Sequence, residues 1–122
     1  MIRGVRGATT VKENKDIHIL NETETLVQEM IKQNKLKPEN VSHAIITTTP
    51  DLTATFPAKV IRSVDGWKHV PVMCMSEIDV PNALEQCIRI MMVVNTDQGQ
   101  QEVQHIFLNE AVKLRPDLVK GE

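Results

Sequence analysis

Apolar and polar residues are arranged along the chain in patterns that predict short strands and two helices. Ile2 to Thr10 is short, partly β-branched and interrupted by two glycines, which favours an opening strand. From Asp16 to about Lys35, Asp16 is a suitable N-cap for a helix. The apolar residues of this segment follow a spacing of three, seven and four positions, which predicts an amphipathic helix: Ile17, Leu20, Val27 and Ile31.

After the first helix, the segment Val41 to Thr49 predicts a buried strand that ends at Pro50-Asp51. Phe56 to Arg62 predicts a short helix, with Pro57 in its first turn and Asp65-Gly66 ending it. Three further segments are strand candidates, of which the last has the weakest pattern: Val70 to Met75, Cys87 to Val94 and His105 to Leu108.

The order of these elements predicts an α/β or α+β fold around one mixed sheet, with helices packed on a face of it. The chain has no internal repeat or linker-like segment, so we expect residues 1–122 to form a single domain. With two Phe, one Trp and no Tyr, the core is expected to consist of Val, Ile, Leu and the six Met residues.

Charge and hydropathy argue against several classes of protein. The 14 Lys and Arg and 16 Asp and Glu residues give a net charge of −2 and are interspersed, so nucleic-acid binding is not expected. The longest uncharged stretch, Asn40 to Pro50, is far short of the roughly 20 apolar residues of a membrane span. Without a secretory signal pattern we expect a cytoplasmic protein, with Cys74 and Cys87 as free thiols.

The sequence contains no motif for a metal or a cofactor. The histidines at positions 18, 43, 69 and 105 have no paired spacing, and no cluster of Asp, Glu, Cys and His has the spacing of metal ligands. Neither a GxGxxG nor a GxSxG pattern is present. We therefore expect no metal and no cofactor.

Arg89 is the one charged residue inside the apolar segment Cys87 to Val94. Burying an unpaired guanidinium costs several kcal/mol, so this side chain needs an anion or water. A salt bridge to Glu77 or Glu85, an edge strand whose arginine points to water, and an anionic ligand are all compatible with the pattern.

Other candidate residues also have structural explanations. Arg6 in the opening strand raises the same question as Arg89, and Cys74 can be an inert buried thiol. Lys59 and Arg62 are three apart and would share a solvated helix face. Glu77, which precedes Asp79 by two residues, can belong to a helix-capping loop.

Five segments, in this order and over nearly the whole chain, together resemble the monofunctional chorismate mutases of the Bacillus type. They are Ile2 to Thr10; Thr49-Pro50-Asp51-Leu52 with Phe56-Pro57-Ala58-Lys59; Cys74 to Val80; Cys87 to Met92; and Leu114 to Leu118. The resemblance implies an α+β homotrimer with a pseudo α/β barrel at its centre and active sites between neighbouring subunits. It also implies an isomerase of aromatic amino acid biosynthesis, in the shikimate pathway to phenylalanine and tyrosine.

The implied reaction converts chorismate to prephenate by a [3,3] rearrangement that needs no nucleophile, cofactor or proton transfer. Catalysis must then come from holding the reactive conformer and from stabilising the charge that separates in the transition state. By resemblance, Arg89 bonds the ether oxygen and a carboxylate, Arg6 binds the side-chain carboxylate, and Glu77 lies by the ring and its hydroxyl.

The resemblance also assigns residues that would bind the substrate. Cys74 would contact the ring hydroxyl, and Phe56 would pack on the ring from the adjacent subunit. Lys59, Arg62 and Arg115 are cations that would attract a dianion to the mouth of the site. Met73, Phe107 and Leu114 are also assigned to substrate binding.

Phe107 is a departure from the family pattern, which usually has tyrosine at this position. Losing one hydrogen bond to a charged group costs roughly 1.5 to 3 kcal/mol, so we expect a poorer KM more than a poorer kcat. The departure also suits an alternative, a non-catalytic trimeric protein that binds an anionic metabolite in the same cleft.

A third possibility is another trimeric enzyme with interfacial clefts, such as a reactive-imine hydrolase, and the matching segments argue against it. The last residues, Leu118 to Glu122, offer little to bury, and we expect a mobile tail.

Overall fold

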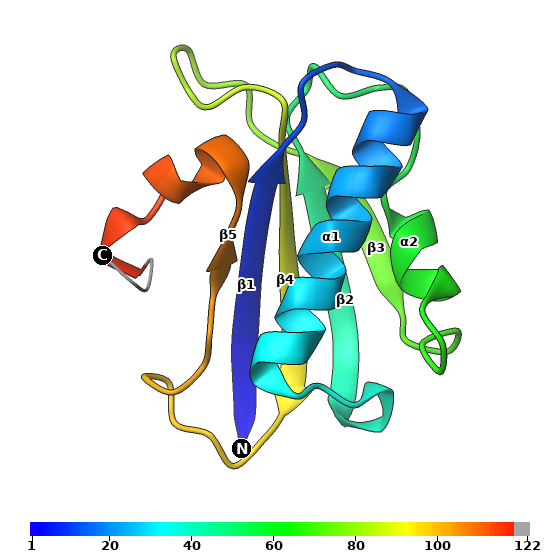
Figure 1. Cartoon of the computed structure of the whole chain (residues 1–122), viewed down its shortest axis with the longest axis vertical. Helices are drawn as coiled ribbons and strands as arrows, with labels where there is room; N and C mark the ends of the chain where they lie inside the picture. The colour runs from blue at the N-terminus through cyan, green and yellow to red at the C-terminus, as the bar shows by residue number, and fades with distance from the viewer. Residues whose placement is uncertain (119–122) are drawn as a thin grey trace.

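The computed structural model describes residues 1–118, so most of the expected tail, residues 119–122, lies outside the described part. Five strands form one sheet in the order β3-β2-β4-β1-β5 (Figure 1). Their bounds are β1 Ile2–Thr10, β2 Val41–Thr48, β3 Val72–Ser76, β4 Cys87–Asn95 and β5 Ile106–Phe107. The pairs β1–β4 and β2–β4 are antiparallel and the pairs β1–β5 and β2–β3 are parallel, which confirms the expected mixed sheet of an α+β fold.

Two α-helices, α1 (Asp16–Asn34) and α2 (Ala58–Ser63), lie side by side on the same face of the sheet (Figure 1). Helix α1 packs closely against β1 because Gly7 has no side chain there. A Cβ at Gly7 would lie 2.4 Å from the sulfur of Met30. Three short 3-10 helices complete the described chain: η1 Pro38–Asn40, η2 Asn109–Lys113 and η3 Pro116–Leu118.

The predicted elements are confirmed with small changes at their ends. The strand over Ile2–Thr10 has the expected bounds, and α1 ends one residue earlier than expected. Asp16 is the first helical residue and not the N-cap, because Lys15 before it has the extended backbone of a cap. Its carboxylate nevertheless accepts a hydrogen bond from the N–H of Ile17.

Helix α2 and strand β3 begin two residues later than predicted. Pro57 caps α2, and Phe56 lies before the helix. The N–H of Val70 is used in a turn that bonds the carbonyl of Trp67, so β3 starts only at Val72. Helix α2 ends at Ser63, slightly before the predicted end at Asp65-Gly66. Gly66 has a φ of 84° in the turn that follows.

Of the four apolar residues predicted to face the core on α1, only Val27 is fully buried. Ile17 is 58% exposed, and Leu20 and Ile31 are only partly buried. Ile17 instead lines a surface pocket together with Thr10 and Asn109. The buried residues of this helix are Ile19, Thr23, Leu26, Val27, Met30 and Asn34. Two of them, Thr23 and Asn34, are polar.

The core also differs from the composition-based prediction. Trp67 is 2% exposed and belongs to the main apolar cluster, together with many Val, Ile and Leu residues. Of the six methionines only Met30 and Met92 are buried in this cluster. Four methionines are exposed instead: Met1, Met73, Met75 and Met91.

Three of these exposed methionines lie on the sheet face that faces away from α1 and α2. Strand register places two rows of side chains across this face, since directly paired residues point to the same side. One row runs through Arg6, Met91, Ile45 and Met73. The next row runs through Ala8, Arg89, Thr47 and Met75. Apolar and cationic side chains therefore share a face that neither α-helix covers.

Candidate active site

Arg89 lies on β4, which is the central strand of the sheet. The proposed edge strand with an arginine pointing to water is therefore wrong. Residues 88, 90, 92 and 94 of this strand pack under the helices, and Arg89 points to the opposite face. The segment has the alternation of a strand with one covered face, which its nearly continuous apolar sequence concealed.

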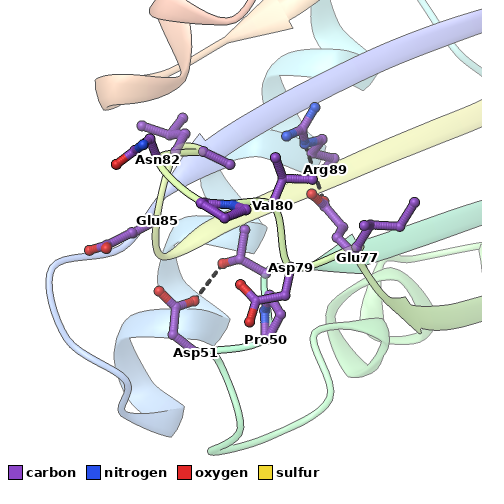
Figure 2. Close-up of a pocket in the computed structure, with 13 residues that line it drawn as sticks. Pro50, Asp51, Glu77, Asp79, Val80, Asn82, Glu85 and Arg89 are labelled. Atoms are coloured by element: carbon purple, nitrogen blue, oxygen red, sulfur yellow. Dashed lines mark hydrogen bonds and ion pairs between the residues drawn. The ribbon is translucent and has the colours of Figure 1, made fainter.

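Glu77 is the anion that Arg89 meets. The Nε of Arg89 lies 3.2 Å from Oε2 of Glu77, and the side chains are 31% and 16% exposed, respectively (Figure 2). Glu85 lines the same cavity but does not form this pair. The predicted salt bridge is thus formed with Glu77.

The Nε of Arg89 is buried and, within residues 1–118, has no hydrogen-bond partner. Its distance to Glu77 is that of an ion pair, but the two groups are not aligned as donor and acceptor. A buried donor without an acceptor is costly, and such groups in native proteins often belong to functional sites. The Arg89 side chain as a whole is 31% exposed and lines the cavity beside Glu77, so its guanidinium can meet an acceptor there.

Glu77 follows β3 in a loop that returns to β4, so the helix-capping role considered for this segment is wrong. The loop and the end of β2 enclose a cavity of about 570 Å³ (Figure 2). Glu77 and Arg89 lie at one end of it, and Asp79, Asn82 and Glu85 lie along the loop.

Arg6 adds a second cation near Arg89. Burial and the neighbouring positive charges of Arg89 and Arg115 lower the pKa of Arg6. Within the described residues no carboxylate forms an ion pair with Arg6, and its guanidinium lies over the ring of Phe107, 5.5 Å from the centroid. Arg6 is therefore a cation without an ion-pair partner in residues 1–118, whereas Arg89 is paired with Glu77.

Phe107 itself is 8% exposed and packs with Ala8 and Ala111, while Leu114 lies against the same small cluster. Arg115 is exposed and pairs with Asp117, with Nη2 2.9 Å from Oδ2. The structure therefore places Phe107 and Leu114 on the same side of the molecule as Arg6, and the charge of Arg115 reaches Arg6.

Cys87 is completely buried next to this cluster. Burial raises the pKa of its thiol to about 11, although Arg89 and Arg6 act in the opposite direction. The thiol is therefore neutral near pH 7 and is not an activated nucleophile.

A second group of predicted residues lies elsewhere. Phe56, Lys59 and Cys74 line another cleft of about 600 Å³ between β3 and the segment that leads into α2. Cys74 pairs in register with Ile46, on the helix-covered face, whereas Arg89 pairs with Thr47 on the opposite face. Within one chain, Cys74 and Phe56 are thus not part of the cavity that contains Glu77 and Arg89.

Met73 and Arg62 do not line this second cleft, and Met73 lies on the sheet face opposite to Cys74. Phe56 is 69% exposed and Met73 is 64% exposed. Lys59 and Arg62 are both exposed on α2, as expected for two residues three positions apart. All four side chains are accessible to another molecule.

The sequence analysis missed two polar residues in contact with the site. The hydroxyl of Thr47 donates a hydrogen bond to Oε2 of Glu77, and Nδ1 of His105 accepts one from the backbone N–H of Arg6. Thr47 lay in a strand read as uniformly buried, and the alternation along β2 was the available signal. His105 had no such signal, because its contact arises from a pairing between distant segments.

No group of three or more His, Cys, Asp or Glu side chains within residues 1–118 could hold a metal ion. In the same residues no helix has both the length and the apolar character needed to cross a bilayer.

Comparison with known proteins places the chain among chorismate mutases. Residues 2–118 match the family described as chorismate mutase type I. Chorismate mutase AroH of Bacillus subtilis (strain 168) is 49% identical over 118 residues, which are 97% of this chain and 93% of that protein. Chorismate mutase AroH of Thermus thermophilus is 41% identical over 123 residues and the full length of both chains.

A solved structure agrees with these sequence matches. The chorismate mutase from Clostridium thermocellum superposes with a TM-score of 0.86 at 46% identity, covering 89% of this chain and 96% of that chain. The structural similarity therefore covers most of the chain.

Proposed function

The chain belongs to the chorismate mutase type I family and acts as a chorismate mutase, an isomerase, and we propose that Arg89, Glu77 and Arg6 form its catalytic centre. The substrate is chorismate, and the proposed reaction is its [3,3] rearrangement to prephenate. The proposal treats residues 1–122 as one domain that acts in the cytoplasm without a metal or other cofactor.

The rearrangement separates charge, and the proposed centre has the groups to stabilise it. As the bond to the ether oxygen breaks, the oxygen gains negative charge and the ring becomes electron-poor. We assign Arg89 to the ether oxygen and Glu77 to the ring side. Both groups are held in place before the reaction begins, so they need not reorganise or titrate.

The single observation that carries this proposal is the Nε–H of Arg89. It is buried on the central strand, has no acceptor within residues 1–118, and lies 3.2 Å from the Glu77 carboxylate. The Arg89 side chain is 31% exposed, so its guanidinium can meet an oxygen that becomes negative in the transition state. Arg6, without a carboxylate partner in the described part of the chain, would bind a carboxylate of the substrate.

We further propose that the active site is completed between two subunits of a homotrimer with a central pseudo α/β barrel. In support, the assigned substrate-binding residues Phe56, Lys59 and Cys74 line a separate cleft from Arg89. The uncovered sheet face also exposes Met73, Met75 and Met91, which suits packing against other copies.

The roles of the remaining residues follow from this arrangement. A neighbouring subunit would bring Phe56 onto the ring and Cys74 to the ring hydroxyl, and Met73 would also contact the substrate. Phe107 and Leu114 would close the side next to Arg6. The exposed cations would attract the dianion to the mouth of the site: Lys59, Arg62 and Arg115.

The function is tested by the loss of chorismate ultraviolet absorbance on addition of purified protein. We expect saturable loss that a chelator does not change. Arg89→Ala should lower kcat by at least about a hundredfold, since it removes a cation from the reacting oxygen. Arg3→Ala is the matched control, because Arg3 lies on β1 but bonds the carbonyl of Gln98 instead of lining the site.

Two results would argue against this function. Turnover retained in Arg89→Ala would remove Arg89 from the centre. A folded wild-type protein that binds prephenate without converting chorismate would instead be a binding protein for an anionic metabolite.

The shared site is tested by mixing two inactive variants. Arg89→Ala lacks the cation of one half-site, and Lys59→Glu reverses a charge in the other half-site. If each active site combines halves from two subunits, co-refolded mixed trimers should regain about a quarter of the wild-type activity. If both halves belong to one chain, the mixture should remain inactive. Light scattering of the wild-type protein measures the oligomeric state independently.

A further inference from the structure

Thr47 on β2 connects the two charged residues of the proposed centre. Its Oγ1 donates a hydrogen bond of 2.6 Å to Oε2 of Glu77, the same oxygen that lies 3.2 Å from Nε of Arg89. Thr47 is also the direct register partner of Arg89 on the neighbouring strand. One short side chain thus lies beside the arginine and holds its carboxylate partner.

Glu77 needs such a contact because its backbone is no longer part of a strand. It follows the last residue of β3, and the next three residues of the loop are exposed. Its N–H donates to the carbonyl of Thr48, at 2.9 Å. Two consecutive residues of β2 therefore hold Glu77, one through its backbone and one through its carboxylate.

The attachment is made at one oxygen of the carboxylate. Both the Thr47 hydroxyl and the Arg89 guanidinium lie at Oε2. Within residues 1–118 no group donates a hydrogen bond to Oε1, and the carboxylate lies at the wall of the cavity. Fixing Oε2 sets the plane of the carboxylate and leaves Oε1 free to face a ligand.

We propose that Thr47 is a positioning residue for the rearrangement, which it serves by holding the Glu77 carboxylate in the orientation that the transition state needs. This inference rests on the proposed role of Glu77. The structural alternative is that Thr47 only stabilises the sheet. Valine has the same shape and suits a strand with apolar neighbours such as Ile45, so a purely structural threonine could be replaced by valine at little cost.

The test compares Thr47→Val, which removes the hydroxyl, with Thr47→Ser, which keeps it. We expect kcat to fall about tenfold in Thr47→Val, as for a lost hydrogen bond to a charged group, while KM changes less. Thr47→Ser should stay within about twofold of the wild type. The control is Thr25→Val on the exposed side of α1, where the hydroxyl bonds only the carbonyl of Asn21.

A double-mutant cycle separates positioning from stability. In a Glu77→Ala background, Thr47→Val should cause no further loss of kcat, because the hydroxyl acts through that carboxylate. An equal loss in both backgrounds, or an unchanged kcat in Thr47→Val, would overturn the proposal. Unfolding measurements on each variant identify any loss that comes from misfolding.

A second measurement does not depend on turnover. Carbon NMR of protein labelled at the glutamate carboxyl groups should show the Glu77 resonance shifted in Thr47→Val and retained in Thr47→Ser. An unshifted resonance in Thr47→Val would overturn the contact itself. If the wild type failed to convert chorismate, the catalytic assignment of Glu77 would fall, and the NMR result would still decide whether Thr47 holds the carboxylate.

Discussion

The guanidinium of Arg6 lies over the ring of Phe107, with its central carbon 5.5 Å from the ring centroid. The ring belongs to the short strand β5, which pairs with β1 directly after Arg6, at Gly7 and Ala8. The two residues are therefore brought together by the pairing of the two ends of the chain. The aromatic face supports the cation from one side and leaves its N–H groups free for an anion.

Phe107→Tyr tests what the aromatic hydroxyl would add. Phe107 supports Arg6 but cannot donate a hydrogen bond to a substrate carboxylate. A tyrosine hydroxyl bonded to that charged group would be worth about 1.5 to 3 kcal/mol, so KM for chorismate should fall by roughly tenfold to a hundredfold. We expect kcat to stay within about twofold of the wild type, and steady-state kinetics measures both constants. An unchanged KM would show that the hydroxyl has no role here.

Phe107→Leu tests the ring itself. Leucine keeps an apolar side chain against Ala8 and Ala111 but removes the aromatic face under Arg6. A cation–π contact is worth about 0.5 to 2 kcal/mol, so KM should rise roughly threefold to thirtyfold. A KM equal to that of the wild type would mean that Arg6 is positioned without the ring.

Salt should weaken the capture of the substrate. Lys59 and Arg62 are exposed on α2, and attraction between exposed cations and a dianion is screened over about 8 Å at physiological ionic strength. We expect KM to rise between about 20 mM and 500 mM sodium chloride, with a smaller change in kcat. The dependence should be flatter in Lys59→Gln/Arg62→Gln. An equal salt dependence in the double variant would assign the attraction to other cations.

Gly7→Ala should destabilise the fold by about 1 to 3 kcal/mol, the usual cost of overpacking a core. A Cβ at Gly7 would lie 2.4 Å from the sulfur of Met30 and 3.1 Å from a methyl carbon of Leu26, both completely buried on α1. Urea unfolding at fixed protein concentration measures the change.

Gly4→Ala is the matched control for this substitution on the same strand. A Cβ there would approach only the sulfur of Met91, at 3.0 Å, and Met91 is 39% exposed and free to move. We expect a smaller loss of stability than in Gly7→Ala. Equal losses in the two variants would mean that the close approach of α1 to β1 is not the reason for the glycine.

The sequence predicted the elements well where one physical signal dominated. The short, partly β-branched segment Ile2–Thr10 with its two glycines predicted β1 with the observed bounds. The face of α1 was harder to predict, because Thr23 and Asn34 are buried there. Each satisfies its polar group through the backbone, Thr23 with the carbonyl of Ile19 and Asn34 with the N–H and carbonyl of Gln104. Polarity alone could not identify these two as buried residues.

The site was predictable in its chemistry and less so in its geometry. A lone arginine in an apolar segment needs an anion, and Glu77 was one of the two carboxylates considered for Arg89. The contribution of Thr47 depends on the register between β2 and β4, which local sequence does not encode. The distance between Cys74 and Arg89 within one chain follows from their opposite sheet faces, and this too depends on the pairing of strands.

The protonation state of His105 affects a hydrogen bond to β1, the strand that carries Arg6. Its Nδ1 accepts a hydrogen bond of 3.0 Å from the Arg6 N–H, one residue before β5 starts to pair with β1. Burial, followed by the charges of Arg6 and Arg115, lowers the pKa of His105. Glu29 on α1 lines the same shallow pocket and is the nearby acidic residue. A proton on Nδ1 would remove the acceptor from the Arg6 N–H.

The folded protein should therefore lose stability as the pH falls. In the unfolded chain this histidine binds a proton near pH 6.5, whereas in the folded protein it does so only at lower pH. Acidification favours the state that binds more protons, which here is the unfolded state. The free energy of unfolding, from urea titrations between about pH 7.5 and 5.5, should decrease more steeply in the wild type than in His105→Asn, whose amide oxygen can accept the same bond without titrating. His69→Asn, at an exposed loop position, should keep the wild-type slope. Identical slopes in the wild type and His105→Asn would show that His105 does not couple protonation to folding.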